Sequence, residues 1–136
     1  MSKKYLVTGA AGFIASQVSE QLLDQGDHVV CVDNLNDYYD VRLKNWRLEQ
    51  LKAHPNAENF SFARLDIEDQ AKVVDLFKAE SPFDAVLNLA ARAGVRYSME
   101  NPHVYISTNA EGTLNLLECM RAQGCNKLVL ASTSSL

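Results

Sequence analysis

The chain of 136 residues has the length of one ordinary domain, and its 47% apolar residues are enough to build a hydrophobic core. The formal net charge is −4, and the 13 Lys and Arg residues are scattered along the sequence. Because phosphate neutralisation needs clustered cations, nucleic acid is not an expected partner. No run approaches the roughly 18 apolar residues of a membrane span, so a membrane is not an expected partner either.

The three cysteines form an odd set without C-x-x-C spacing. Neither a disulfide framework nor a metal site is therefore expected, and this cysteine usage fits a reducing cytoplasm. The first residues lead directly into a short strand-like run, without the longer apolar core and small-residue cleavage site of a signal peptide. We accordingly expect a cytoplasmic location.

Short apolar runs alternate with segments of helical period along the whole chain. The runs lack polar alternation, which is typical of strands buried on both faces. The predicted strands are 4–8, 28–32, 59–63, 84–89 and 126–131, and the predicted helices are 12–25, 40–53, 68–79 and 102–122. Strict alternation predicts an α/β fold, a Rossmann-type doubly wound parallel sheet of about five strands in the order 3-2-1-4-5. Residues 1–136 are expected to form one domain.

A glycine-containing turn, TGAAGFIA at 8–15, follows the first predicted strand and opens the first predicted helix. The unpaired backbone N–H groups and the dipole at a helix N-terminus favour a dinucleotide pyrophosphate. A Cβ at Gly9 or Gly12 would hold the backbone away from the phosphates or prevent the tight turn. The pattern alone is also compatible with an ordinary strand-to-helix turn.

Asp33 follows the second predicted strand at a spacing from Gly9 close to that of dinucleotide-binding domains. A carboxylate there accepts hydrogen bonds from the adenosine ribose hydroxyls. It would also repel a 2′-phosphate, and no Arg stands directly beside it, so the sequence favours NAD over NADP. Taken alone, Asp33 could be a solvated loop acid, but the turn, the spacing and the alternating elements together predict an NAD site.

Five motifs in order resemble the extended short-chain dehydrogenase/reductases, and among them the UDP-glucuronate 4-epimerases. They are TGxxGFI at 8–14, DNLNDYYD at 33–40, LDI at 65–67, NLAARAGVRYS at 88–98 and ASTSS at 131–135. The resemblance covers the whole chain. It implies the NAD-binding part of an enzyme that interconverts UDP-glucuronate and UDP-galacturonate through transient C4 oxidation by NAD⁺, with a UDP-sugar as the partner of the full-length enzyme.

The resemblance assigns cofactor contacts residue by residue. Phe13 and Ile14 would contribute backbone amides to the pyrophosphate, and Asp33 with Asn34 and the following loop would hold the adenosine ribose. The other residues so assigned are Gly9, Gly12, Asp66, Ile67, Leu89, Ala90, Ala91 and Thr108.

Two of these positions keep an alternative interpretation. Asp66 and Ile67 would contact adenine; Asp66 could also simply cap the helix predicted at 68–79, as short acids do well, and both could hold at once. Thr108 falls where the family places polar residues near the nicotinamide, and it could equally be a packing residue of the helix predicted at 102–122.

The resemblance also indicates residues on the substrate side. Thr133 would orient the reacting sugar hydroxyl as a catalytic residue, although a hydroxyl at a strand end is often bonded to backbone instead. Arg96 is a candidate partner for the substrate carboxylate or phosphate, which bidentate Arg suits, and it could also be a solvated loop residue. Ser134 and Ser135 would face the sugar acid.

The sequence departs from the family pattern in two ways. Ala15 replaces the third glycine of the fingerprint, where Ala is tolerated. The 136 residues also contain no Tyr-x-x-x-Lys pair, so we expect a truncated fragment without turnover and with weakened NAD binding. An exposed last strand at 126–131 and the helix at 102–122 would then favour homo-oligomers.

Two other functions remain open from the sequence. One is another extended-family activity, a sugar-nucleotide dehydratase or decarboxylase. The other is a non-catalytic protein that binds a nucleotide or associates with itself.

Overall fold

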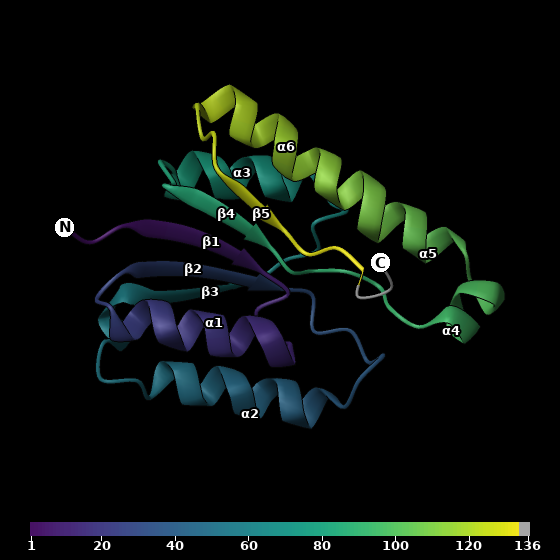
Figure 1. Cartoon of the computed structure of the whole chain (residues 1–136), viewed down its shortest axis with the longest axis horizontal. Coiled ribbons are helices and arrows are strands. Elements are labelled where there is room, and N and C mark those ends of the chain that lie inside the picture. The colour runs from purple at the N-terminus through teal and green to yellow at the C-terminus, as the bar shows by residue number, and fades with distance from the viewer. Residues whose placement is uncertain (134–136) are drawn as a thin grey trace.

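The computed structural model describes residues 1–133 (Figure 1). The strands are β1 (Lys4–Thr8), β2 (His28–Asp33), β3 (Phe60–Arg64), β4 (Ala85–Asn88) and β5 (Leu128–Leu130). The helical segments are α1 (Phe13–Asp24), α2 (Val41–Lys52), the 3₁₀ turn η1 (Ala57–Asn59), α3 (Gln70–Glu80), α4 (Val95–Glu100), α5 (His103–Tyr105), the π-helical turn η2 (Ile106–Glu111) and α6 (Gly112–Gln123).

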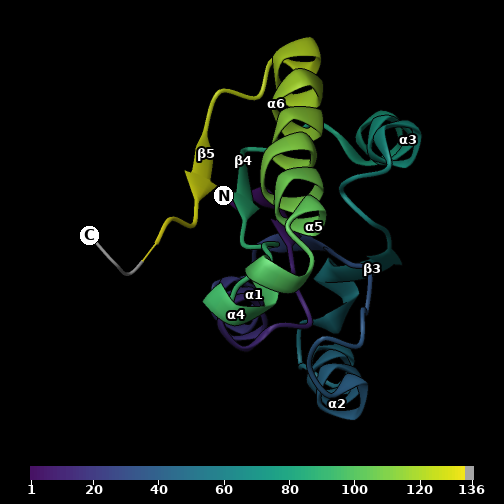
Figure 2. The same ribbon diagram turned by 90° about the vertical axis from the view of Figure 1, so that its right-hand side faces the viewer.

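The five strands form one parallel sheet in the order β3-β2-β1-β4-β5, which confirms the predicted order. Helices α1 and α2 cover one face of the sheet, and α3 and α6 cover the other (Figure 1). Figure 2 looks onto the end of the sheet toward which the strands point, where α4 and α5 lie. The arrangement is the three-layer architecture that strict strand–helix alternation predicts.

Consecutive residues of the central strands are buried in two different cores. Leu6 of β1 packs with Phe77 and Leu116 from the α3–α6 layer, whereas the next residue, Val7, packs with Leu23 of α1. All five side chains are at most 1% exposed. Because side chains alternate between the faces of a strand, a strand covered on both sides must be apolar at every position. This explains the continuous apolar runs of the sequence.

Side-chain hydrogen bonds tie the ends of β1 and β4 together. The Thr8 hydroxyl donates to Oδ1 of Asn88 over 2.6 Å and accepts the N–H groups of Leu89 and Ala90, each over 3.1 Å. The strand order reverses at this β1–β4 pair, since β2 and β3 follow on one side of β1 and β4 and β5 on the other. Ligands of open α/β sheets bind in the crevice beyond such a switch point.

The segment after β4 differs from the prediction. Residues 95–100 form α4, for which no helix was predicted, and the single helix predicted at 102–122 contains the π-helical turn η2. A helix of six residues is too short to show an apolar period, and a π turn leaves no signature in the spacing of apolar residues. Neither feature was therefore accessible to the periodicity argument.

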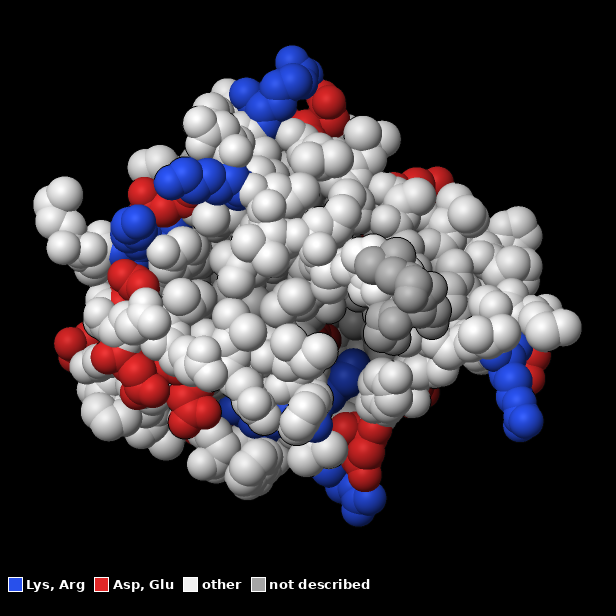
Figure 3. Space-filling model, in the orientation of Figure 1, with Lys and Arg blue, Asp and Glu red and all other residues white. Residues whose placement is uncertain are grey.

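No helix within residues 1–133 combines the length and the apolar character needed to cross a bilayer. On the face shown in Figure 3, basic and acidic side chains of both signs are scattered mainly around the rim, and the centre is largely uncharged. Basic side chains do not gather into a stripe on this face.

Candidate cofactor site

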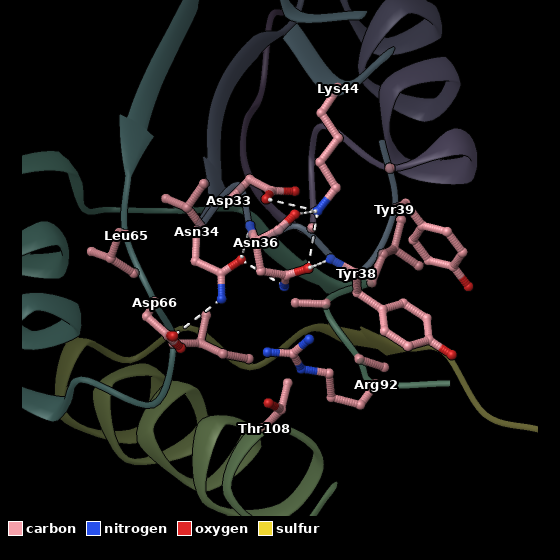
Figure 4. A pocket seen from close by; sticks show the side chains of 17 residues that line it. Asp33, Asn34, Asn36, Tyr38, Tyr39, Lys44, Leu65, Asp66, Arg92 and Thr108 are labelled. Atoms are coloured by element: carbon pink, nitrogen blue, oxygen red, sulfur yellow. Dashed lines mark hydrogen bonds and ion pairs between the residues drawn. The ribbon is translucent and has the colours of Figure 1, made fainter. Parts of the chain in front are cut away.

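A pocket opens at the carboxyl end of the sheet, beyond the β1–β4 switch point (Figure 4). Its walls come from the turn after β1, the long loop after β2, the segments after β3 and β4, and η2. The lining residues are Gly9, Gly12, Val32, Asp33, Asn34, Asn36, Tyr38, Tyr39, Lys44, Leu65, Asp66, Ile67, Leu89, Ala90, Ala91, Arg92 and Thr108.

The glycine turn forms the floor of this pocket. Gly9 has φ +66°, and a Cβ there would lie 2.8 Å from the carbonyl oxygen of Leu89 and 2.9 Å from the nitrogen of Ala90. Gly12 caps α1 without a side chain, so no side-chain acceptor takes up the first N–H groups of this helix. The first turn of α1 thus presents N–H groups without a side-chain cap and a positive helix end at the pocket, as binding of a pyrophosphate requires.

Asp33 lies directly against the glycine turn. Its Oδ2 accepts the N–H of Ala11 over 3.1 Å, and its Oδ1 accepts the N–H of Leu35 over 2.7 Å. The residue is 8% exposed. Because a carboxylate oxygen has more than one lone-pair site, both oxygens can still accept ribose hydroxyls. The acid that the sequence places near the ribose is therefore held rigidly at the phosphate turn.

Lys44 of α2 is a pocket residue that the sequence reasoning missed. It is 6% exposed, its Nζ donates to the carbonyl oxygen of Asn36 over 2.9 Å, and it lies 4.0 Å from Oδ1 of Asp33. A signal was present, because Lys44 belongs to the buried stripe of α2 together with Leu48 and Leu51. A lysine in an otherwise apolar stripe is seldom buried unless it is paired. Its cation partly offsets the negative charge of Asp33.

Asp66 faces the pocket and does not cap α3. Its Oδ2 accepts Nδ2 of Asn34 over 3.1 Å, and its Oδ1 accepts the N–H of Glu68 over 3.0 Å. The capping acid of α3 is Asp69, whose side chain accepts the N–H of Lys72. The alternative that Asp66 serves as the helix cap is therefore wrong, because α3 begins later than predicted.

The π-helical turn η2 forms the wall opposite Asp33. The hydroxyl of Thr108 donates to Oε1 of Glu68. The side chain of Asn109 accepts the N–H of Arg92 over 2.8 Å and donates to its carbonyl oxygen over 3.1 Å. Such π turns recur at functional sites, and here the widened turn carries both residues that secure this wall.

Tyr38 lines the pocket and belongs to a cluster of tyrosines. Tyr38 packs against Tyr97 with ring centroids 5.2 Å apart, and Oη of Tyr105 donates to the carbonyl oxygens of Ala93 and Gly94 over 2.8 and 2.7 Å. Gly94 has φ +99°, and a Cβ there would lie 2.5 Å from Oη of Tyr38. The sequence motifs contained Tyr38 and Tyr97, but their spacing along the chain gave no sign that the two loops meet.

The structure brings most of the predicted cofactor residues into one pocket. All of them line it except Phe13 and Ile14. Those two occupy the first positions of α1 beside Gly12, with side chains 66% and 65% exposed. Their N–H groups belong to the first turn of α1, and the backbone role that the resemblance implies for them stays a prediction.

The residues expected on the substrate side are not gathered in this pocket. Arg96 is exposed on α4 and does not line it, whereas Arg92 does. Thr133 is exposed beyond β5. Ser134 and Ser135 lie outside the described residues.

Sheet order, glycine turn and buried acid together define an α/β domain of the Rossmann type. The chain belongs to the GDP-mannose 4,6 dehydratase family, whose model matches residues 6–136.

Relatives confirm the resemblance to sugar-nucleotide epimerases. The chain is 56% identical over 132 residues to the UDP-glucuronate 4-epimerase of Thermodesulfobacterium geofontis, an alignment that covers 97% of this chain and 40% of that protein. It is 46% identical to UDP-glucuronate 4-epimerase 3 of Arabidopsis thaliana, with 96% and 29% covered. The chain thus spans at most about 40% of the length of these relatives.

Solved epimerases share the fold. A variant of the UDP-glucuronic acid 4-epimerase of Bacillus cereus, in complex with NAD and UDP-4-deoxy-4-fluoro-glucuronic acid, matches with a TM-score of 0.84 and 36% identity over 97% of this chain and 40% of that chain. The UDP-glucose 4-epimerase of Stenotrophomonas maltophila, with bound NAD and formylated UDP-arabinopyranose, matches with 0.82 and 31% over 98% and 38%.

Replacing Gly9 by Ala tests the close approach of the turn to the β4 segment. Gly26 is a matched control, because it has φ +82° but nothing within 4 Å of a built Cβ. Gly26→Ala should therefore cost only the left-handed backbone strain, about 1–2 kcal/mol. Gly9→Ala adds a backbone clash to the same strain, so urea titration should show a clearly larger loss of unfolding free energy. Equal losses would contradict this account of the turn.

Proposed function

We propose that residues 1–136 form one domain, the NAD-binding portion of a sugar-nucleotide 4-epimerase of the UDP-glucuronate type. The observation that carries the proposal is the 3.1 Å hydrogen bond from Ala11 N–H to Asp33. It joins the expected phosphate turn and the expected ribose acid in one cradle. The bound NAD of the solved epimerases and the names of the relatives support the same function.

The roles proposed for the cofactor residues are those that the resemblance implies, and the pocket that most of these residues line supports them. The backbone of Gly9, Gly12, Phe13 and Ile14 receives the pyrophosphate, and Asp33 with Asn34 accepts the ribose hydroxyls. Asp66 and Ile67 hold the adenine. The residues proposed to let the rest of the cofactor lie across the strand ends are Leu89, Ala90, Ala91 and Thr108.

Bound NAD⁺ would supply the hydride acceptor for transient oxidation at C4 of the sugar. The residues of this chain would bind and orient the cofactor. On the substrate side we propose Thr133 to orient the reacting hydroxyl, and Arg96, Ser134 and Ser135 to contact the sugar acid. A threonine hydroxyl is not ionised near neutral pH, so Thr133 cannot be the general base.

Asp33 favours NAD over NADP in this proposal. A carboxylate that accepts the ribose hydroxyls would lie close to a 2′-phosphate, and like charges repel each other strongly in a poorly solvated pocket. Lys44 reduces this repulsion because its Nζ lies 4.0 Å from Oδ1 of Asp33. Discrimination against NADP should therefore be real but moderate.

A sugar-nucleotide dehydratase is the second candidate function. The family whose model matches residues 6–136 carries that description. The relatives named above are epimerases at up to 56% identity, which is the observation that places epimerisation first.

Calorimetric titration with NAD tests the proposed cofactor site. The chain should bind NAD, and Asp33→Asn should weaken binding about 10- to 100-fold, because hydrogen bonds to a charged acceptor contribute roughly 1.5–3 kcal/mol. Asp75→Asn, on the exposed face of α3, is the matched control and should leave the affinity unchanged. A well-folded chain that takes up no NAD would contradict the proposed function.

The isolated 136-residue chain should not interconvert UDP-glucuronate and UDP-galacturonate. The printed sequence contains no Tyr-x-x-x-Lys pair, and without a positioned base the hydroxyl proton at C4 is not removed. Product analysis by liquid chromatography checks this, with the relative from Thermodesulfobacterium geofontis as the positive control. Turnover by the 136-residue chain would show that another group serves as the base.

The isolated chain should also associate with itself. β5 is the last strand of the sheet on its side, with Val129 and Leu130 54% and 51% exposed, and α6 exposes Leu114 and Leu117. Unprotected strand edges and apolar patches promote association. Val129→Lys should shift the mass measured by light scattering toward the monomer.

Val95→Lys is the matched control for that substitution. It adds the same charge at a side chain 81% exposed on α4, away from β5, and should leave the association unchanged. A wild-type chain that stays monomeric at high concentration would rule out association through β5 or α6.

A further inference from the structure

Arg92 carries a buried donor without an acceptor. Its Nε is enclosed and has no hydrogen-bond partner among the described residues. The ion pairs within residues 1–133 do not include Arg92 either. Burying a charged group costs free energy unless a counter-charge or hydrogen bonds compensate. The pocket therefore holds a buried guanidinium N–H for which the described residues provide no acceptor.

The backbone of Arg92 is held firmly in place. Asn109 clamps it with two hydrogen bonds, accepting its N–H over 2.8 Å and donating to its carbonyl oxygen over 3.1 Å. Figure 4 shows the guanidinium directed across the pocket toward the end that carries Asp66, between Asn36 and Thr108. The fixed backbone thus directs the side chain of Arg92 into the pocket.

The other charges of the pocket already have partners. Lys44 lies 4.0 Å from Asp33, and Asp66 accepts hydrogen bonds from Asn34 and from the N–H of Glu68. Within the described part of the pocket, Arg92 is the charged group with a buried N–H that has no acceptor. The missing partner should thus be an anion brought by the ligand.

We propose that Arg92 binds the diphosphate of the dinucleotide, from the side opposite the glycine turn. The proposal rests on the cofactor function proposed above and names a further residue for that site. The first residues after β4 approach Gly9, whose Cβ would lie 2.8–2.9 Å from Leu89 and Ala90. Arg92 lines the same pocket as Gly9 and Gly12, so its side chain and the start of α1 border one cavity. A planar guanidinium fork suits bidentate binding of phosphate oxygens.

Calorimetry with NAD, ADP and adenosine tests this role. Arg92→Gln should weaken NAD and ADP about tenfold or more, as expected for loss of a charge-assisted hydrogen bond. Adenosine, which has no phosphate, should lose less than about twofold. Arg92→Lys keeps the charge but loses the planar guanidinium fork, so its affinity for NAD and ADP should lie between those of the wild-type chain and Arg92→Gln. Arg121→Gln, an exposed arginine of α6 that pairs with Glu118, is the control and should change nothing.

Two further measurements separate binding from a merely structural effect. Added salt should weaken ADP binding more in the wild-type chain than in Arg92→Gln, because the variant has lost a charge–charge interaction. Asn109→Ala should weaken ADP binding in the wild-type background but not in Arg92→Gln, because Asn109 acts through Arg92. Circular dichroism establishes whether each variant is folded. If Arg92→Gln does not fold, the ADP affinity of Arg92→Lys and its salt dependence test the phosphate contact instead.

The outcomes distinguish this inference from the proposed function. Equal losses for ADP and adenosine would show that Arg92 stacks on the adenine and would overturn phosphate binding, as would an unchanged ADP affinity. In both cases NAD binding by the wild-type chain would leave the cofactor site standing. A folded wild-type chain that binds none of the three ligands would overturn both proposals.

Discussion

The approach of Gly9 to the segment after β4 is the constraint on which the pocket depends. A Cβ at Gly9 would lie 2.8 Å from the carbonyl oxygen of Leu89. Only glycine therefore lets the turn after β1 contact the first residues after β4. The hydroxyl of Thr8 secures the same junction by accepting the N–H groups of Leu89 and Ala90. Backbone donors at the α1 terminus and the residues that follow β4 are thereby brought to opposite sides of one space.

Some polar groups of the pocket find their partners within the described part of the folded chain, whereas one does not. Asp33 accepts hydrogen bonds from the N–H groups of Ala11 and Leu35 and lies beside Lys44. It therefore stabilises the glycine turn before any ligand is bound. Arg92 has no comparable partner among residues 1–133. A buried donor without an acceptor raises the free energy of the ligand-free chain, and an anionic ligand that accepts from Nε would relieve that cost on binding.

Local patterns determined what the sequence could predict. Two-sided burial requires apolar residues at almost every strand position, so the strands could be anticipated. The strand order and the places of Gly9 and Asp33 followed from the Rossmann-type fold and from the spacing between glycine turn and acid. The same patterns carry no information on contacts between distant loops. The tyrosines Tyr38 and Tyr97 meet through tertiary packing, and Lys44 enters the site because α2 turns its buried stripe toward the loop after β2. The π turn that carries Thr108 has no periodic signature.

The two arginines of the NLAARAGVRYS motif show how the backbone decides between similar residues. Sequence reasoning chose Arg96, since a motif arginine can bind a carboxylate or a phosphate. Gly94 has φ +99° and ends the extended segment, after which α4 begins at Val95. Arg92 precedes Gly94 and lines the pocket, whereas Arg96 follows Gly94 and is exposed on α4. A left-handed glycine between them thus assigns one arginine to the cofactor pocket and leaves the other exposed on α4.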